Sequence, residues 1–454
     1  MKTTFQYFLI SILIISCKQK NNNLSKLDNT KTDGHPSWIM QSNIYEVNTR
    51  QYTPEGTFTA FEKHLDRLKE MGVETLWFMP INPISLKDRK RDTTELGSYY
   101  AVADYKAINP EYGNMDDWKN LVKHAHEKGL KVIIDWVPTH SGADHKWLTT
   151  NPDFYLKDSN GNPISQYDWT DTRKLDYNNP ELVDSMIDCM KFWINETGID
   201  GYRCDVAGEV PNEFWIKCNT ELKKMKNIFM LAEGDKPSLH ETGFDASYTW
   251  EDFDMMKKIA RSERVATALD TIINKHDTLF KPNSIRMYFT SNHDENSWNK
   301  ADFATMPGNI HAPFAVLTQT IKRTVPLIYG GQEEPFLDSL KFFVKDTITF
   351  GNYKRAEFYK TLLKLRRENA ALSANASYTK VKSSNDDAIF AYVRQNENKK
   401  VLVVLNLSKN VADFSLNSDL ISGAVKEIFT NKKETLKSNQ TFHLNDWGYS
   451  VYVF

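Results

Sequence analysis

Cysteine is scarce in this chain, and its few cysteines lack the spacing of a metal or disulfide framework. Only four occur in 454 residues. Cys17 ends an apolar N-terminal run, and the other three, Cys189, Cys204 and Cys218, are an odd number with no CxxC or Cys/His pattern. We therefore expect these three to be buried free thiols, with neither a zinc site nor a disulfide scaffold.

The chain also lacks an excess of charge of one sign and a glycine-rich phosphate loop. Its formal net charge is −2 and it contains no basic block, which excludes the electrostatic footprint of a nucleic-acid-binding protein. The stretch "EVNTRQY" after the first predicted strand is not a dinucleotide-binding turn, which argues against a doubly wound sheet. Aromatic residues make up 12% of the chain, and this composition suits a neutral, ring-shaped substrate.

The N-terminus is typical of an export signal. Lys2 precedes the apolar run 5–16, which is short for a membrane span. The run ends in "IISC", which resembles a bacterial lipobox and implies cleavage of a signal peptide (1–16) and lipid attachment at Cys17. The alternative is an ordinary signal peptide. We interpret the polar stretch 17–37 as a flexible tether, because it contains only two leucines.

The residue after Cys17 bears on the location of the anchored protein. Lys18 is not the aspartate that favours retention at the inner membrane in some bacteria, and the tether lacks an acidic surface-export cluster. We therefore expect lipid anchoring in the cell envelope, at the outer membrane and facing the periplasm rather than at the cell surface.

Short apolar runs alternate with amphipathic stretches from residue 38 to 370. Eight strands are predicted, at 43–48, 75–81, 131–138, 201–206, 228–234, 247–250, 284–290 and 325–331. Helical periodicity lies between them, for example at 59–72, 115–129 and 180–198, and several of these stretches end in glycine. Eight such repeats predict a (β/α)8 barrel, the TIM-barrel class of α/β fold.

Two regions depart from this repeat. The interval 142–178 after the third strand is too long for a simple connection, so we expect a small inserted subdomain beside the active face. From 371 to 454 the pattern changes to strands, including 388–395, 399–408, 426–430 and 449–454. This segment predicts a C-terminal antiparallel β-sandwich domain.

Carboxylates stand at the ends of successive predicted strands. Arg203 and Asp205 share one face of their strand, since side chains alternate along a strand. Asp135 ends the preceding strand, Glu233 follows Asp205 by 28 residues, and Asp294 lies 61 residues further on. These spacings fit barrel units of about 31 residues, so the carboxylates converge on one pocket at the C-terminal face of the barrel. Arg203 is expected to keep Asp205 ionised, and a pair of carboxyls is what glycoside hydrolysis requires.

These stretches resemble the signature regions of the α-amylase superfamily, glycoside hydrolase family 13. The four regions are, in order, "DWVPTHS", "GYRCDVA", "LAEGD" and "SNHDE". The segments "TLWFMPINPI" and "GSYYAVADYKAINPEYG" resemble the family's second strand and its following loop. The match spans most of residues 40 to 370, and the C-terminal strands fit the family's C-terminal domain.

The resemblance assigns roles to individual residues. It implies that Asp205 is the nucleophile, Glu233 the general acid/base and Asp294 the stabiliser of the transition state. The substrate-binding residues that it implies are Tyr100, stacking on the sugar, His140 and His293, binding its hydroxyls, and Arg203, orienting the nucleophile. Trp136, Trp215 and Trp298 lie next to motif residues and are either further stacking platforms or core residues.

The sequence departs from the family pattern at two places. Thr139 stands where most relatives have an asparagine that binds calcium, so no cofactor is expected to be required and structural calcium is doubtful there. The stretch 157–164 has too few carboxylates for a calcium loop and predicts a turn. After the nucleophile, Gly208 and Glu209 replace the Lys-His of typical α-amylases and are closer to the neopullulanase and cyclomaltodextrinase branch.

The sequence therefore predicts a retaining hydrolase of α-1,4-glucosidic bonds in starch, glycogen or maltooligosaccharides. The alternatives are a neopullulanase- or cyclomaltodextrinase-like hydrolase, an α-glucan transglycosylase and, outside this class, a non-catalytic glucan-binding lipoprotein. The last alternative is disfavoured because Asp205, Glu233 and Asp294 are all present. We expect an α-glucan substrate, membrane contact only through the lipid anchor, no nucleic-acid partner and a monomer, because the dimer-forming N-terminal domain of the neopullulanase branch is not seen before the barrel.

Overall fold

The computed structural model describes residues 32–89, 95–299, 309–335 and 338–454. The predicted signal peptide, Cys17 and most of the predicted tether lie outside the described residues. Within the described ranges, no helix is both long and apolar enough to span a membrane.

Eight parallel strands form the central sheet, in the order β10-β1-β2-β3-β6-β7-β8-β9. Their bounds are β1 Ile44–Val47, β2 Thr75–Phe78, β3 Lys131–Trp136, β6 Gly201–Cys204, β7 Phe229–Ala232, β8 Ala246–Tyr248, β9 Ile285–Met287 and β10 Leu327–Tyr329. Backbone hydrogen bonds from Val325 N to Arg286 O (3.0 Å) and from Leu327 N to Tyr288 O (2.9 Å) join β9 to β10. The sheet thus closes into the predicted (β/α)8 barrel, and all eight predicted strands are confirmed.

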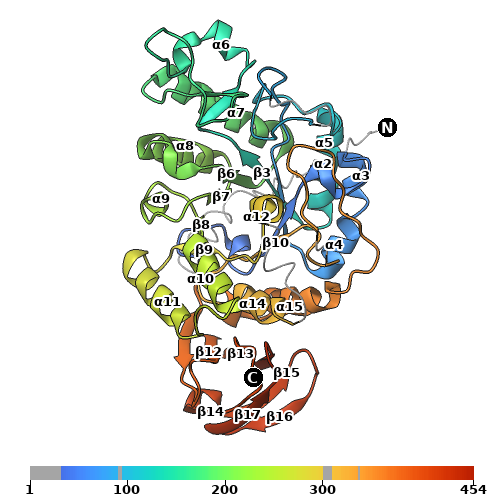
Figure 1. Cartoon of the computed structure of the whole chain (residues 1–454), viewed down its shortest axis with the longest axis vertical. Coiled ribbons are helices and arrows are strands. Elements are labelled where there is room, and N and C mark those ends of the chain that lie inside the picture. The colour runs from blue at the N-terminus through green and yellow to red at the C-terminus, as the bar shows by residue number, and fades with distance from the viewer. Residues whose placement is uncertain (1–31, 90–94, 300–308, 336–337) are drawn as a thin grey trace, which may run out of the picture.

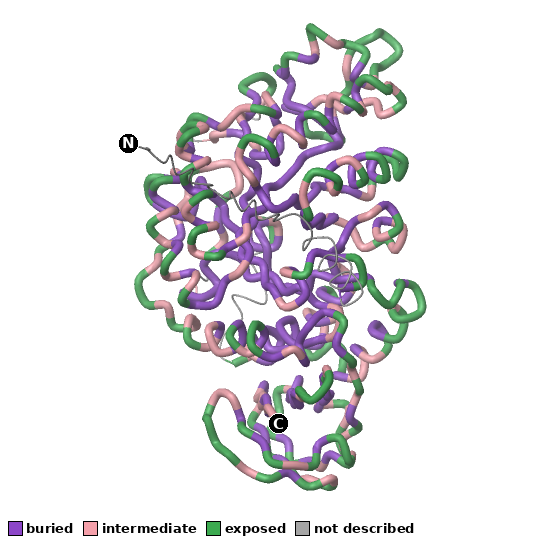
Figure 2. Tube along the Cα trace, turned by 180° about the vertical axis from the view of Figure 1, so that it is seen from behind, coloured by how far each residue is buried: buried purple, intermediate pink, exposed green. Residues whose placement is uncertain are grey.

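The helices of this region lie around the barrel or over its end (Figure 1). They are α2 Thr49–Tyr52, α3 Phe58–Glu62, α4 Leu65–Met71, α5 Met115–Glu127, α7 Pro180–Thr197, α8 Asn212–Met225, α9 Ser238–Glu241, α10 Trp250–Ala260, α11 Ala268–Leu279, α12 His293–Asn299, α14 His311–Thr320 and α15 Ala356–Glu368. Two residues set the ends of helix α7. The Asn179 side chain caps its first turn, and Gly198 ends it in the left-handed conformation at φ 71°. The strands are buried, and the exposed residues lie on the outer helices and loops (Figure 2).

The predicted helix over 59–72 is wrong as a single element. The chain forms α3 and α4, separated by Lys63 and His64. His64 N donates to Phe61 O at 2.8 Å, three residues back, so the turn tightens and the helix is interrupted. The apolar faces of both helices still pack into the barrel's outer core, which is why the periodicity looked continuous.

The long interval after β3 forms the predicted inserted subdomain. It contains β4 His140–Gly142, β5 Thr172–Lys174, α6 Trp147–Thr150 and the short 3-10 helix Pro152–Phe154. Strands β4 and β5 pair in antiparallel fashion. The stretch 157–164 is the predicted turn, in which Asp158 Oδ1 accepts from the backbone N–H groups of Asn160 and Asn162, both at 2.9 Å.

The C-terminal segment is the predicted antiparallel β domain (Figure 1). One sheet has the order β11-β12-β13-β18-β15-β16, and β14 and β17 form a second. The bounds are β11 Ser377–Val381, β12 Ile389–Asn396, β13 Lys399–Asn406, β14 Ala412–Asn417, β15 Gly423–Glu427, β16 Lys433–Leu436, β17 Asn439–Leu444 and β18 Tyr449–Val453. Alternate residues of β12 and β13 face the barrel or the second sheet, which gives the domain two apolar faces.

Two boundaries differ from the prediction. The strand predicted at 426–430 lies at Gly423–Glu427, and residues 428–430 form a turn in which the Glu427 carboxylate accepts from Phe429 N and Thr430 N. The tether predicted to end at residue 37 also ends earlier. The buried side chain of His35 contacts Asp245 Oδ1 at 2.9 Å and Asn283 O at 2.8 Å, so the chain already packs against the barrel there.

Cys189, Cys204 and Cys218 are buried free thiols, as predicted. Burial raises the pKa of Cys189 to about 12, so its thiol is protonated at neutral pH. All three side chains pack in the core between barrel strand β6 and the helices α7 and α8.

Candidate active site

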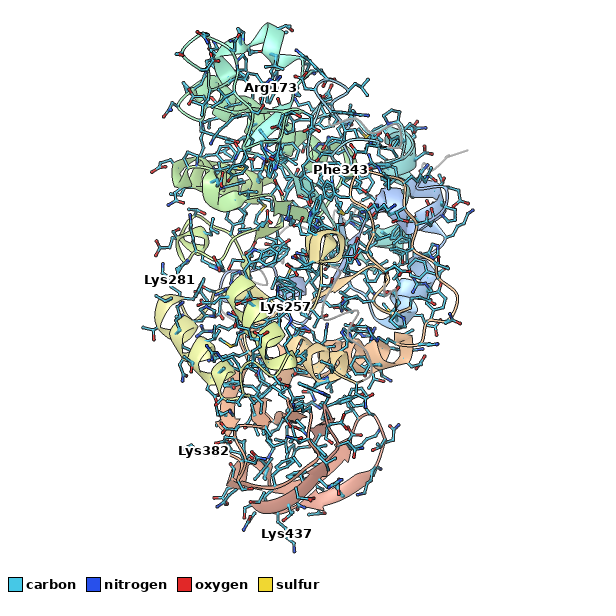
Figure 3. All side chains as sticks on the ribbon, viewed as in Figure 1. Arg173, Lys257, Lys281, Phe343, Lys382 and Lys437 are labelled. Atoms are coloured by element: carbon cyan, nitrogen blue, oxygen red, sulfur yellow. The ribbon has the colours of Figure 1, made fainter. Side chains whose placement is uncertain are left out.

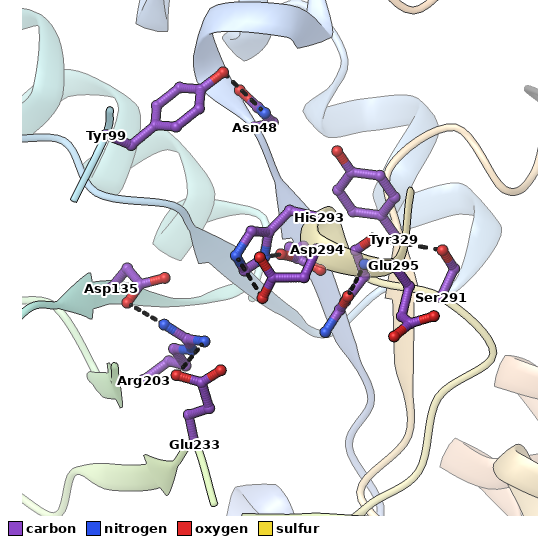
Figure 4. Close-up of polar contacts among 12 residues, drawn as sticks. Asn48, Tyr99, Asp135, Arg203, Glu233, Ser291, His293, Asp294, Glu295 and Tyr329 are labelled. Carbon is purple, nitrogen blue, oxygen red and sulfur yellow. Dashed lines mark hydrogen bonds and ion pairs between the residues drawn. The ribbon is translucent and has the colours of Figure 1, made fainter. Parts of the chain in front are cut away.

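The buried guanidinium of Arg203 in β6 holds three carboxylates together at the C-terminal end of the barrel, and Figure 4 shows two of them, Asp135 and Glu233, beside it. Its Nη1 atom lies 2.9 Å from Asp135 Oδ1 and 2.8 Å from Asp205 Oδ1, and its Nη2 atom lies 3.1 Å from Glu233 Oε2. Its Nε atom donates to the Tyr248 hydroxyl at 3.1 Å. The carboxyls come from the ends of β3, β6 and β7, so neighbouring strands place them as the spacing predicted.

The backbone directly after Asp205 is strained, and this strain positions an N–H group against Glu233. Val206 has φ 41°, which a β-branched residue rarely adopts. In this conformation its N–H donates to Glu233 Oε2 at 2.6 Å. The turn after the predicted nucleophile therefore orients the carboxyl of the predicted acid.

Asp205 and Asp135 share the charge of one guanidinium, and burial acts on the pKa of both carboxyls. Burial and the charge of Glu233 raise the pKa of Asp205 well above its usual value, and the opposing attraction of Arg203 does not offset them. Burial likewise raises the pKa of Asp135 to about 6. Arg203 therefore favours the ionised form of Asp205, in the predicted direction, while burial and the charges of Glu233 and Asp135 oppose it.

A second network lies across the pocket and is centred on His293. Its Nε2 atom contacts the Tyr100 hydroxyl at 2.8 Å and Asp294 Oδ2 at 3.3 Å. Its Nδ1 atom lies 2.5 Å from Oε1 of Glu46, a fully buried residue of β1. The Tyr100 hydroxyl also donates to Asp135 Oδ2 at 3.1 Å, which joins this network to the carboxyls around Arg203.

The two histidines of the site carry different charges. Burial lowers the pKa of His140 to about 4, so this ring is neutral at pH 7. Burial alone would also lower the pKa of His293, but the charges of Asp294 and Glu46 outweigh it and raise that pKa to about 9. His293 is therefore a cation at neutral pH, with its Nε2–H directed at the Tyr100 hydroxyl and Asp294.

These groups surround a cavity of about 380 Å³ at the mouth of the barrel. The cavity is lined by Gly97, Ser98, Tyr100, His140, Trp169, Asp171, Thr172, Asp205, Val206, Glu233, His293, Asp294, Trp298, Phe342 and Phe343. Six of the seven predicted site residues in the barrel are in this set. The seventh, Arg203, lies beneath it, where its side chain has no exposed surface.

Sequence reasoning missed several residues of the site. Trp169 and Asp171 belong to the inserted subdomain, and Phe342 and Phe343 follow β10. Glu46 could have been found, because it is a charged residue within a strand whose other members are buried. Of the three tryptophans next to the motifs, Trp136 and Trp215 are core residues and only Trp298 reaches the cavity.

Glu46 offers a test of the charge on His293. In Glu46→Gln the ring loses a negative neighbour, so the pKa of His293 falls below its value of about 9. If the cationic ring binds substrate, the alkaline limb of the kcat/KM profile shifts to lower pH, while the profile of the matched control Glu295→Gln does not. Glu295 is also buried, and it pairs with Lys257 at 3.5 Å. An unchanged alkaline limb in Glu46→Gln would contradict this role.

The fold and the site together define a class of protein. A (β/α)8 barrel carries paired carboxyls on adjacent strands, beneath a cavity lined by aromatic rings and hydroxyl-binding groups. This arrangement is that of a glycoside hydrolase.

Comparison with known proteins names the family. The family model for the α-amylase catalytic domain matches residues 25–169 and 164–389, and the model for the C-terminal domain of maltogenic amylase matches 378–451. The chain therefore belongs to the α-amylase family, glycoside hydrolase family 13.

Individual relatives agree with this assignment. The α-amylase MalA of Haloarcula japonica is 25% identical over 86% of this chain, which spans 59% of that relative's length. Neopullulanase 2 of Thermoactinomyces vulgaris is 29% identical over 82% of this chain and 70% of its own. The crystal structure of a maltogenic α-amylase from Thermotoga neapolitana superposes with a TM-score of 0.84, at 26% identity, covering 92% of this chain and 99% of that one.

Proposed function

We propose that this protein is a retaining α-glucan hydrolase that cleaves α-1,4-glucosidic bonds of starch, glycogen or maltooligosaccharides. The observation that carries the proposal is the single guanidinium of Arg203, which bridges Asp205 and Glu233 at the floor of an aromatic-lined cavity. A shared cation holds the two carboxyls close together, and a short separation favours attack by a carboxylate over attack by water.

In this mechanism Asp205 attacks the anomeric carbon while Glu233 gives its proton to the departing glycosidic oxygen. A covalent glycosyl ester forms and the aglycon leaves. Glu233 then takes a proton from water, which attacks the same carbon and releases Asp205. Asp294 and the cationic His293 bind the sugar from the far side, and Tyr100 stacks on its ring.

A second candidate is favoured by the residues after the nucleophile. Glu209 Oε2 accepts from the side-chain amide of Gln166 at 2.9 Å, so the inserted subdomain contacts the loop that follows Asp205. This loop differs from that of typical α-amylases, and neopullulanase 2 is among the relatives. A neopullulanase- or cyclomaltodextrinase-like specificity, or transfer to a sugar hydroxyl in place of water, would use the same catalytic residues.

The product profile tests the proposal. The protein from residue 18 onward is incubated with amylose, pullulan and maltoheptaose, and the anomeric form of the first products is measured by NMR. Initial α-anomeric maltooligosaccharides support a retaining α-1,4-glucan hydrolase, and panose from pullulan supports the second candidate. Initial β-anomers, or no cleavage of any of the three, would overturn the proposal.

We also propose that catalysis needs no calcium. The Thr139 hydroxyl lies 2.8 Å from His140 Nδ1, so this short side chain is already engaged by a residue of the site. The described residues contain no group of three His, Cys, Asp or Glu side chains placed to hold a metal ion. Because a hydroxyl is a poorer Ca²⁺ ligand than an amide carbonyl, treatment with EDTA should leave both kcat/KM and Tm unchanged. A fall in either value that added Ca²⁺ reverses would contradict this expectation.

The envelope location is a further proposal. The "IISC" sequence supports lipid attachment at Cys17, and we place the monomeric enzyme at the outer membrane, facing the periplasm. Metabolic labelling with a fatty acid should mark the full chain but not Cys17→Ser. Digestion by protease added to intact cells would contradict the periplasmic orientation.

A further inference from the structure

The first described segment of the chain lies at the end of the barrel opposite the catalytic mouth. His35 contacts Asp245 Oδ1 at 2.9 Å and Asn283 O at 2.8 Å, and these two residues precede β8 and β9. The Trp38 ring meets Phe229, the first residue of β7, edge to face with ring centres 5.9 Å apart. The segment therefore lies across the N-terminal ends of the strands. We call this face, with the loops that precede the strands, the base of the barrel.

The proposed lipid anchor is joined to this base. Asn283 Nδ2 donates to Asp33 O at 3.4 Å, so the chain is held at the base from there on. Thr32 follows Cys17 by 15 residues, and a chain of that length spans at most about 50 Å. The catalytic carboxyls lie at the C-terminal ends of the same strands, on the far side of the barrel. A lipid at Cys17 is therefore attached to the face that is remote from the active site.

Three lysines surround the half-buried Trp38 ring and the neighbouring strand ends. Lys131 begins β3, and its Nζ atom lies 5.6 Å from the centre of the Trp38 ring. Lys223 belongs to the last turn of α8, and Lys226 lies between α8 and β7. The exposed fractions of the three side chains lie between 31% and 37%. A tryptophan ring beside lysine side chains is typical of a protein surface that meets lipid headgroups.

The positive charge of these lysines exceeds that of their acidic partners. Lys131 and Lys226 share the carboxylate of Asp200, at 3.3 and 2.9 Å. Lys223 lies 3.0 Å from the carboxylate of Asp245. Both aspartates are buried, so three partly exposed cations face solvent above two acids that lie beneath the surface. The surroundings of Trp38 therefore attract anionic headgroups.

The balance is different at the edge of the base. Lys281 follows α11 and pairs with Glu241 at 3.3 Å, and both side chains are exposed. Figure 3 shows Lys281 at the outer edge of the barrel, away from Phe343 near α12. Lysine and acid are matched there, so the surplus of positive charge lies nearer to Trp38.

The catalytic mouth carries charge of the opposite sign. Four acidic side chains line its cavity, Asp171, Asp205, Glu233 and Asp294, whereas His293 is the only cationic side chain in the described lining. Anionic phospholipids attract lysine side chains and repel carboxylates. The same membrane surface therefore favours contact with the base and disfavours contact with the mouth.

We propose that the base of the barrel around Trp38 rests on the phospholipid surface to which Cys17 is anchored, and that the catalytic mouth faces away from it. This inference rests on the proposed lipid attachment. The lipid supplies the affinity for the membrane, and the lysines and the tryptophan ring determine which face turns toward it. A long glucan then reaches the cleft from the aqueous side of the anchored enzyme.

The test compares the distance of two faces from the lipid headgroups. Asn227→Cys, on the base between α8 and β7, and Asn160→Cys, in the turn of the inserted subdomain, each add one exposed thiol to the full lipidated chain. The thiols of the three described native cysteines are buried, so a fluorophore marks the new site. The labelled proteins are bound to vesicles of phosphatidylethanolamine and phosphatidylglycerol that contain a nitroxide-headgroup lipid. We expect quenching at Asn227→Cys to be several times stronger than at Asn160→Cys.

The same two labelled proteins, produced from residue 18 onward, are the matched controls and should show little quenching. Equal quenching at the two sites of the lipidated protein, or stronger quenching at Asn160→Cys, would overturn the inference and leave lipid attachment standing. Failure of the full chain to sediment with the vesicles would instead overturn lipid attachment, and the inference with it.

Activity on the vesicles provides an independent readout. The kcat/KM for amylose should be the same for the vesicle-bound enzyme and for the protein from residue 18 onward, because the mouth is open to solution. A fall for amylose on the vesicles, with the value for maltoheptaose retained, would place the mouth against the membrane and overturn the inference. Absence of hydrolysis in both forms would overturn the proposed reaction and leave the quenching result valid.

Discussion

Asp205→Asn is expected to lower kcat by about 10⁴-fold or more on every α-glucoside, including α-glucosyl fluoride. An amide cannot form the glycosyl ester, and an activated leaving group does not replace a missing nucleophile. The change is nearly isosteric, and Arg203 keeps its contacts with Asp135 and Glu233 at 2.9 and 3.1 Å. Single-turnover measurements on both substrates, with Tm as a check on folding, test the prediction.

Asp135→Asn is the matched control for Asp205→Asn. Both carboxylates accept from the same Arg203 nitrogen, at 2.9 and 2.8 Å, but only Asp205 lines the cavity. Removing Asp135 therefore perturbs the same charge network without removing the attacking group, and its loss of kcat should be much smaller. If the two variants lost activity equally, the role of Asp205 would be the electrostatic one that both share.

The barrel could be predicted because each strand is a short apolar run buried on both faces. Such runs stand out between amphipathic helices, and their spacing places Asp135, Asp205 and Glu233 at neighbouring strand ends. Parallel strands in register bring their ends to one edge, so the geometry of these carboxyls follows from the order of the strands. The other predicted residues that line the cavity, Tyr100, His140, His293 and Asp294, lie in loops or at helix starts that follow barrel strands.

Residues that depend on distant packing could not be predicted in this way. Phe342 and Phe343 lie on a loop whose position is set by the Gln51 amide, almost 300 residues earlier in the chain. The contact of Glu46 with His293 likewise joins β1 to the start of α12. Local periodicity does not predict contacts between residues so far apart in the chain. The only indication in the sequence is the charge of Glu46 within the buried strand β1.

The protonation of the site also needed the three-dimensional arrangement. From the sequence, Arg203 and Asp205 are a simple ion pair, two residues apart on one face of a strand. In the structure the buried guanidinium of Arg203 contacts three carboxyls, those of Asp135, Asp205 and Glu233, so one positive charge is shared by three acidic side chains. Burial and the neighbouring acids therefore raise the pKa of Asp205 and of Asp135 above their usual values, which two residues of one strand could not indicate.

Glu233→Gln tests whether Glu233 supplies the proton to the departing glycosidic oxygen. On maltooligosaccharides, loss of the acid is expected to lower kcat by about 10²- to 10⁴-fold. With α-glucosyl fluoride, whose leaving group needs no protonation, formation of the glycosyl ester should be far less affected. Its hydrolysis still needs Glu233 as a base, so fluoride release should show a burst and mass spectrometry should find a hexosyl adduct on Asp205.

Glu209→Gln provides the same chemical change on the loop that follows Asp205. Glu209 contacts Gln166 and is not among the residues lining the cavity, so its substitution should not discriminate between the two substrates. Equal losses on maltooligosaccharide and fluoride in Glu233→Gln, with no burst and no adduct, would remove Glu233 from proton transfer. Its contact with Arg203 and the 2.6 Å hydrogen bond from Val206 N would then serve only to hold the site together.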